Sequence, residues 1–143
     1  MIVGSGIDVV EIERVERALA RHGRRFEERV FHPNEIAGCR GNEIAGCSGR
    51  EVAGGRGGRR AAPFYAQRFA AKEALMKAVG TGWARGVRWV DIEVVGRSGG
   101  FGIELHGEVA NVARRRGVAY IHLGLGRSRS LALATVLLDA SAP

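Results

Sequence analysis

The sequence predicts an α+β protein, and two patterns along the chain predict it. Residues 64–80 are almost entirely strong helix formers, and a second helix-type stretch covers about 108–116. Four apolar segments alternate like strands, at residues 87–95, 101–105, 118–125 and 131–138. Short strands mixed with helices indicate a mainly antiparallel sheet packed against a long central helix. With 143 residues, we expect a single domain over 1–143.

Charge and composition limit the classes of function. The net charge is +7, which suits an acidic partner such as a nucleotide, an acidic protein or a nucleic acid. Basic residues do not alternate with aromatic ones, so nucleic-acid binding is the minor alternative and we expect none. The longest apolar run is far shorter than the ~20 residues that span a bilayer, and no signal peptide is recognisable. We therefore expect a cytoplasmic protein without a membrane partner, with Cys39 and Cys47 as free thiols.

The first residues predict a short buried strand, formed by Ile2, Val3, Ile7, Val9 and Val10. Its glycines allow another backbone to approach closely. Asp8 lies inside this apolar run, and a buried carboxylate must be paired, hydrogen-bonded or bound to a cation. The alternative is that Asp8 caps the next helix.

That next helix is expected from Glu11 to about Arg24. Ile12, Val15 and Leu19 form its apolar stripe. A basic ridge runs along another side and consists of Arg14, Arg17, Arg21 and Arg24. A solvated face is the plain alternative for such a charge run.

Residues 34–57 contain three copies of an eight-residue pattern, starting at positions 34, 42 and 50. This period is too short for a solenoid repeat, and its glycines disfavour both helix and strand. We expect a mobile, glycine-rich loop at about 36–60.

The central helix is expected to begin at Pro63 and to end at Gly80. Its core-facing set is Phe64, Ala71, Leu75 and Ala78. Glu73, Lys77 and Gly80 share another face at spacing i, i+4, i+7. That face carries a carboxylate, an ammonium and a glycine turn, which together could meet a metal ion and a phosphate. The alternative is a surface ion pair worth about 0.3–0.5 kcal/mol.

After this helix, the first strand segment, Val87 to Val95, puts Val90, Ile92 and Val94 on one face. Glycines at 96–100 form a turn, and Gly117 ends the shorter helix.

Two motifs carry a family resemblance. Gly4, Gly6, Asp8, Glu11 and Arg14 match Gly-x-Gly-x-Asp-x-x-Glu-x-x-Arg, and residues 68–82 read Arg-Phe-Ala-Ala-Lys-Glu-Ala-Leu-Met-Lys-Ala-Val-Gly-Thr-Gly. Residues 26–35 and 89–94 extend the match. The chain resembles the holo-acyl-carrier-protein synthase family, the small phosphopantetheinyl transferases of bacterial fatty-acid synthesis. The resemblance implies the phosphopantetheinyl-transferase fold and a homotrimer with active sites at subunit interfaces.

The resemblance also implies an activity and its residues. The family moves 4′-phosphopantetheine from coenzyme A to a serine of apo-acyl carrier protein, giving holo-acyl carrier protein and adenosine 3′,5′-bisphosphate. Asp8 and Glu73 would hold Mg²⁺, or Mn²⁺, and act in catalysis with Lys77. The sequence leaves open whether Glu73 or a water on the metal takes the serine proton. The implied coenzyme A ligands are Arg68, Lys72, Lys77, Gly80, Thr81, Gly82 and Arg127. The carrier protein would meet the basic ridge, chiefly Arg14 and Arg21.

The last hairpin departs from the family pattern. Where the family has Ser-x-Ser-His, this chain has Gly124, Gly126 and Arg127. Losing these hydrogen-bonding groups costs about 0.5–1.5 kcal/mol each, part of which Arg127 can recover at a phosphate. We expect weaker binding of coenzyme A. The alternative is a weakened or non-catalytic homologue that still binds carrier protein.

Overall fold

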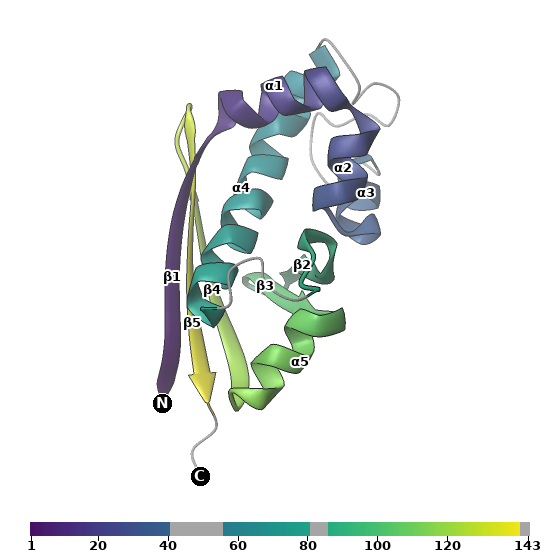
Figure 1. Ribbon diagram of the computed structural model, residues 1–143. Coiled ribbons are helices and arrows are strands. Elements are labelled where there is room, and N and C mark those ends of the chain that lie inside the picture. Colours follow the sequence, from purple (N-terminus) through teal and green to yellow (C-terminus); the bar gives the residue numbers. More distant parts are fainter. Residues whose placement is uncertain (41–55, 81–85, 141–143) are drawn as a thin grey trace.

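A computed structural model describes residues 1–40, 56–80 and 86–140 (Figure 1). In chain order, its elements are β1 (Ile2–Glu11), α1 (Ile12–His22), α2 (Arg24–Val30), α3 (Pro33–Arg40), α4 (Arg56–Val79), a 3₁₀ turn (Trp89–Asp91), β2 (Ile92–Arg97), β3 (Gly100–Leu105), α5 (Gly107–Arg115), β4 (Val118–Arg127) and β5 (Leu131–Ala140). The predicted α+β class and long central helix are confirmed. Among these described residues, no helix is both long and apolar enough to cross a membrane.

The helix α4 separates two layers of the molecule. On one side lies an antiparallel sheet in the order β1-β5-β4. On the other side, α2 and α3 lie near the β2–β3 hairpin, as Figure 1 shows. The core lies along α4, where Phe64, Ala71, Leu75 and Ala78 are buried as predicted.

Two glycines let β1 lie directly against the α4 backbone. A Cβ atom added at Gly6 would overlap the carbonyl oxygen of Ala74, and one added at Gly4 would overlap that of Ala78. The prediction that these glycines allow a second backbone to approach closely is confirmed. The contact fixes how far β1 lies from the polar face of α4.

The prediction that the apolar residues of β1 are buried is wrong for three of them. Ile2, Ile7 and Val9 are 52–57% exposed, whereas Val10 is buried. Successive strand residues point to opposite faces, so only one set meets α4. The exposed set continues on β5 through Leu131, Leu133 and Leu137. We call this surface, made of these six residues, the outer sheet face.

Several predicted boundaries need correction. The helix α4 starts at Arg56, so Pro63 lies inside it rather than at its first position. Residues 36–40 belong to α3 and 56–60 to α4, so the loop expected at 36–60 is narrower; 41–55 lie outside the described residues. At the other end, Gly80 has the left-handed φ of 71° predicted for the helix terminus.

The other boundary errors have local causes. The helix expected from Glu11 to Arg24 stops at His22, because Gly23 at φ 50° breaks it and Arg24 begins α2. The strand expected from Val87 begins only at Ile92, after a 3₁₀ turn across which Arg88 pairs with Asp91 at 2.7 Å. The strands expected at 118–125 and 131–138 form and run about two residues further.

Candidate active site

The site begins with a contact between β1 and α4. The Lys77 ammonium donates to Asp8 Oδ1 at 2.8 Å and to the carbonyl oxygen of Ile7 at 3.0 Å. The Asp8 side chain is 16% exposed, so it is a largely buried carboxylate with a partner, as predicted. Capping is not its role, since the residue preceding α1 is Glu11.

Glu73 lies one turn before Lys77 on the same side of α4. Partial burial raises the pKa of Glu73, the negative charge of Asp8 raises it further, and Lys77 opposes both. Two carboxylates from distant parts of the sequence therefore lie close enough to repel one another. The hydrogen bond to Asp8 raises the pKa of Lys77, which keeps this side chain an ammonium near neutral pH.

This donor set fits a hard divalent cation. Mg²⁺ prefers one or two carboxylates and leaves its other positions to water and phosphate oxygens. Asp8 and Glu73 supply such oxygens, and their mutual repulsion would be relieved by a cation between them.

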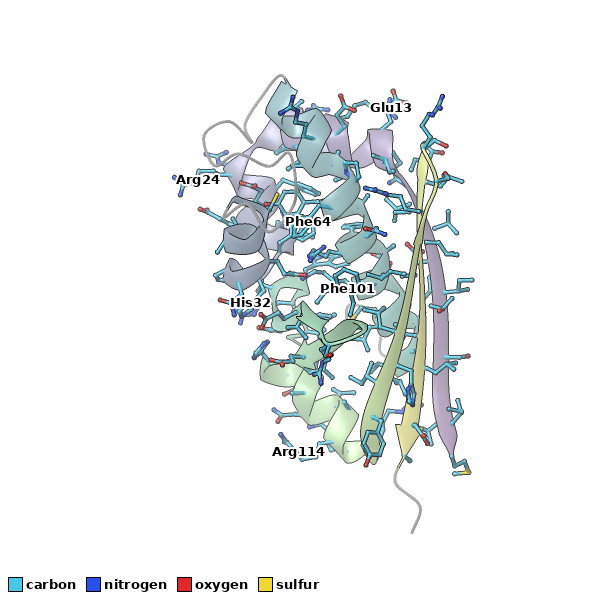
Figure 2. The ribbon with its side chains drawn as sticks, turned by 180° about the vertical axis from the view of Figure 1, so that it is seen from behind. Glu13, Arg24, His32, Phe64, Phe101 and Arg114 are labelled. Carbon is cyan, nitrogen blue, oxygen red and sulfur yellow. The ribbon has the colours of Figure 1, made fainter. Side chains whose placement is uncertain are left out.

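Arg68 lies on a different side of α4. It is five positions before Glu73, which turns it by about 140° around the helix axis. Its guanidinium stacks 3.3 Å from the centre of the Phe64 ring and lies 4.0 Å from Glu35 Oε1. Together with residues of α3 and β2 it lines a cavity of about 390 Å³. The same guanidinium is 5.8 Å from the centre of the Phe101 ring, and Figure 2 labels Phe64 and Phe101 in the middle of the molecule.

Lys72 is enclosed within the chain. It is fully buried, pairs with Glu35 at 2.6 Å and donates to the carbonyl oxygens of Trp89 and Ile92 at 3.1 and 2.5 Å. Burial lowers the pKa of Lys72, although Glu35 acts to raise it. This ammonium joins α3, α4 and β2 inside one subunit, so its predicted contact with coenzyme A would require these bonds to change.

The remaining predicted coenzyme residues are spread out. Gly80 is at the exposed end of α4, Thr81 and Gly82 lie outside the described residues, and Arg127 is exposed at the end of β4. Sequence reasoning missed Arg116, which donates to the carbonyl oxygen of Val79 and so lies beside Gly80. Arg116 is the last of three consecutive arginines, and nothing in that run indicated which of them would reach the end of α4.

The two altered glycines of β4 belong to the outer side of the sheet. Gly124 pairs with Thr135 and Gly126 with Leu133, and both partners are exposed. Paired residues in an antiparallel sheet point to the same face. Asp8 pairs with the buried Ala134 and so lies on the opposite face, toward α4.

The basic ridge is shorter than predicted. Arg14, Arg17 and Arg21 are exposed on α1, but Arg24 belongs to α2 and lies 3.6 Å from Glu28. In Figure 2, Arg24 projects from the same side as His32, away from Glu13 at the start of α1.

Comparison with known proteins agrees with this geometry. A sequence model described as the 4′-phosphopantetheinyl transferase superfamily matches residues 4–136. The chain belongs to this superfamily and, within it, to the holo-acyl-carrier-protein synthases. It is 41% identical to the holo-[acyl-carrier-protein] synthase of Solibacter usitatus, over 97% of this chain and 99% of that protein. It is 43% identical to the protein of the same name from Alkalilimnicola ehrlichii, over 99% of both.

A solved structure supports the same assignment. The holo-(acyl-carrier-protein) synthase of Bacillus anthracis, crystallised in complex with CoA (3′,5′-ADP), superposes with a TM-score of 0.71. It is 33% identical and covers 99% of each chain. The predicted family, fold and enzyme class are thereby confirmed: this chain is a phosphopantetheinyl transferase.

Proposed function

We propose that Asp8, Glu73 and Lys77 form the centre at which this chain transfers 4′-phosphopantetheine from coenzyme A to a serine of apo-acyl carrier protein. The observation that carries the proposal is the convergence of these three side chains across β1 and α4. They belong to the two motifs that identify the family, and relatives at about 40% identity are named for this reaction.

Phosphoryl transfer requires the enzyme mainly to position the two substrates and to neutralise the charge on the phosphates. The serine oxygen forms a bond to the phosphorus next to pantetheine, and the bond from that phosphorus to adenosine 3′,5′-bisphosphate breaks. Asp8 and Glu73 would hold Mg²⁺, which when bound would supply charge neutralisation for the phosphates of coenzyme A. Lys77 stays protonated and adds a second positive charge beside the phosphates.

Glu73 is the residue we assign to take the serine proton. Asp8 already accepts a hydrogen bond from Lys77, so of the two carboxylates Glu73 is the one with the less engaged oxygens for this proton. It carries this proton away as the serine oxygen attacks. Asp8 is hydrogen-bonded to Lys77, and we assign it to metal binding alone.

We also propose that the enzyme is a homotrimer. The outer sheet face presents six apolar side chains that are 37–57% exposed in a single chain. Such a contiguous apolar surface is typical of an interface. Arg68 and its cavity lie on a different side of α4 from Asp8, so a neighbouring subunit could bring its Arg68 to the phosphates held here. The reaction would take place in the cytoplasm.

The carrier protein is proposed to dock on α1. Arg14, Arg17 and Arg21 are exposed along this helix, and their guanidinium groups suit carboxylates on an acidic helix. Arg21→Glu should raise the KM for carrier protein about tenfold or more, whereas its KM for coenzyme A should stay unchanged.

The test is a mass measurement of apo-acyl carrier protein incubated with the enzyme, coenzyme A and Mg²⁺. The carrier serine should gain the phosphopantetheine mass, and Asp8→Asn and Glu73→Gln should each slow this at least about 100-fold. Glu104→Gln, at an exposed glutamate of β3, is the matched control and should react normally. No mass gain with the natural sequence would favour the alternative, a non-catalytic protein that binds the carrier.

A further inference from the structure

A second cluster of metal-binding side chains lies on the far side of α4 from Asp8. His32 directly precedes α3, Glu93 is on β2, and His106 directly precedes α5. His106 Nε2 is 2.8 Å from Glu93 Oε2, and His32 Nδ1 is 3.5 Å from the same oxygen. One ligand atom from each of the three residues lies within 4.8 Å of the others.

These distances come close to those of a tetrahedral site. Zinc lies about 2.0–2.1 Å from imidazole nitrogen and carboxylate oxygen, so neighbouring donor atoms are about 3.3 Å apart. The two distances to Glu93 bracket this value. The imidazole rings stack with their centres 4.8 Å apart and 17° between their planes, so small rotations would move both nitrogens.

The surroundings already orient the donors. The side-chain amide of Asn34 donates to Glu93 Oε1 at 2.9 Å, which leaves Oε2 directed at the two histidines. The backbone N–H of Asn34 donates to His32 Nδ1 at 3.2 Å, which helps to orient this ring. Nδ1 and Oε2 lie 3.5 Å apart, so a cation between them could contact both. Metal binding at Nδ1 would replace the bond from Asn34.

We propose that His32, Glu93 and His106 form a binding site for Zn²⁺, separate from the carboxylate pair proposed for Mg²⁺. Imidazole is a borderline ligand that selects zinc and its transition-metal neighbours over magnesium. Three protein ligands leave one coordination position open. Both histidines line a cavity of about 770 Å³, so the open position faces a space that admits water or a small anion. Bound metal would tie the starts of α3 and α5 to β2.

The test uses chain without a polyhistidine tag, stripped with chelator and kept in excess Mg²⁺ so that Asp8 and Glu73 are occupied. Calorimetric titration with ZnCl₂ should give one site per chain, and Co²⁺ at the same site should show the visible bands of a four-coordinate ion. His106→Gln keeps a donor toward Glu93 but removes a ligand. It should weaken Zn²⁺ binding by more than the roughly 10–100-fold that loss of an outer-shell partner costs.

The matched control is His122→Gln. His122 on β4 also faces a carboxylate, Asp139 at 3.8 Å, but it is more exposed and belongs to no such cluster among the described residues. This variant should bind Zn²⁺ like the natural chain and gain thermal stability from it to the same extent. Failure of the natural chain to bind Zn²⁺ stoichiometrically, or equal binding by His106→Gln, overturns the proposal. Transferase activity is not measured, so neither result depends on the proposed function.

Discussion

Adding a single methyl group at Gly6 tests whether the close packing of β1 against α4 positions Asp8. Gly6→Ala places a Cβ atom where the carbonyl oxygen of Ala74 already lies, with the backbone nitrogen of Ala78 also too close. The obstacle is helix backbone, which cannot rotate away as a side chain would. Overpacking in a core costs about 1–3 kcal/mol and occasionally more, and this position belongs at the upper end.

Two measurements follow from this magnitude. A loss of about 3 kcal/mol in the free energy of unfolding should appear in urea titration and should lower Tm by roughly 10 °C for a chain of this size. Because Asp8 is two residues further along β1, moving the strand also weakens its contact with Lys77. Transferase activity should therefore fall even at temperatures where the variant is folded. Protein concentration must be held constant, since an oligomer's Tm depends on it.

The control is the same substitution at a glycine with free space. Gly96→Ala, on β2, meets no atom within 4 Å, and its effect should stay within about 0.5 kcal/mol. If Gly6→Ala were as stable as Gly96→Ala and as active as the natural chain, the close approach would not be what positions Asp8.

Three further predictions concern charge and association. Lys72→Met leaves Glu35 buried without its cation and should cost about 3–5 kcal/mol in urea titration; the double variant with Glu35→Gln should recover part of this. In metal-free protein, the pKa of Glu73 measured by carbon NMR should lie above that of an ordinary glutamate and fall in Asp8→Asn, and Mg²⁺ affinity should drop as pH falls through it. Ile7→Glu puts a charge on the outer sheet face, so light scattering should show a lower molar mass.

Local sequence patterns predicted some surroundings of the candidate residues and missed others. Asp8 within an apolar strand predicted a carboxylate with a partner, and in the structure that partner is Lys77. The burial of Lys72 was not predictable in this way. It depends on Glu35 and on two carbonyl oxygens after the helix, which only the tertiary fold brings together.

Other sequence predictions were wrong because the same residue pattern is compatible with two structures. Proline is favoured at a helix start, which is where Pro63 was expected, but Pro63 lies inside α4, where it cannot donate a backbone hydrogen bond. Apolar residues in β1 predicted burial, yet a strand has two faces and α4 covers one. His32, Glu93 and His106 lie far apart in the sequence, and their spacing matches no metal-binding motif. Their proximity follows from how α3, β2 and α5 meet.

The β4–β5 hairpin has Gly124 and Gly126 where the family has serines, and restoring one serine tests which side of the sheet faces the coenzyme. Gly126 has space for a side chain, since an added Cβ atom would meet only Leu133 at 3.7 Å, whereas one at Gly124 would be 2.7 Å from the Thr135 hydroxyl. Gly126→Ser can therefore restore a hydroxyl without strain. One hydrogen bond of about 0.5–1.5 kcal/mol should lower the KM for coenzyme A about 2- to 12-fold.

Gly126 is on the same side of the sheet as the outer sheet face, and Asp8 is on the opposite side. A serine hydroxyl at position 126 would therefore reach a bound coenzyme only where a neighbouring subunit covers the outer sheet face. Gly126→Ser should thus improve the KM in the assembled protein and have no effect in the Ile7→Glu background. Ala110→Ser, on α5 and away from this sheet, controls for a general effect of an added serine. An unchanged KM in the assembled Gly126→Ser protein would mean that the lost hydroxyl does not weaken coenzyme binding. An equal gain in both backgrounds would instead place the coenzyme within a single subunit.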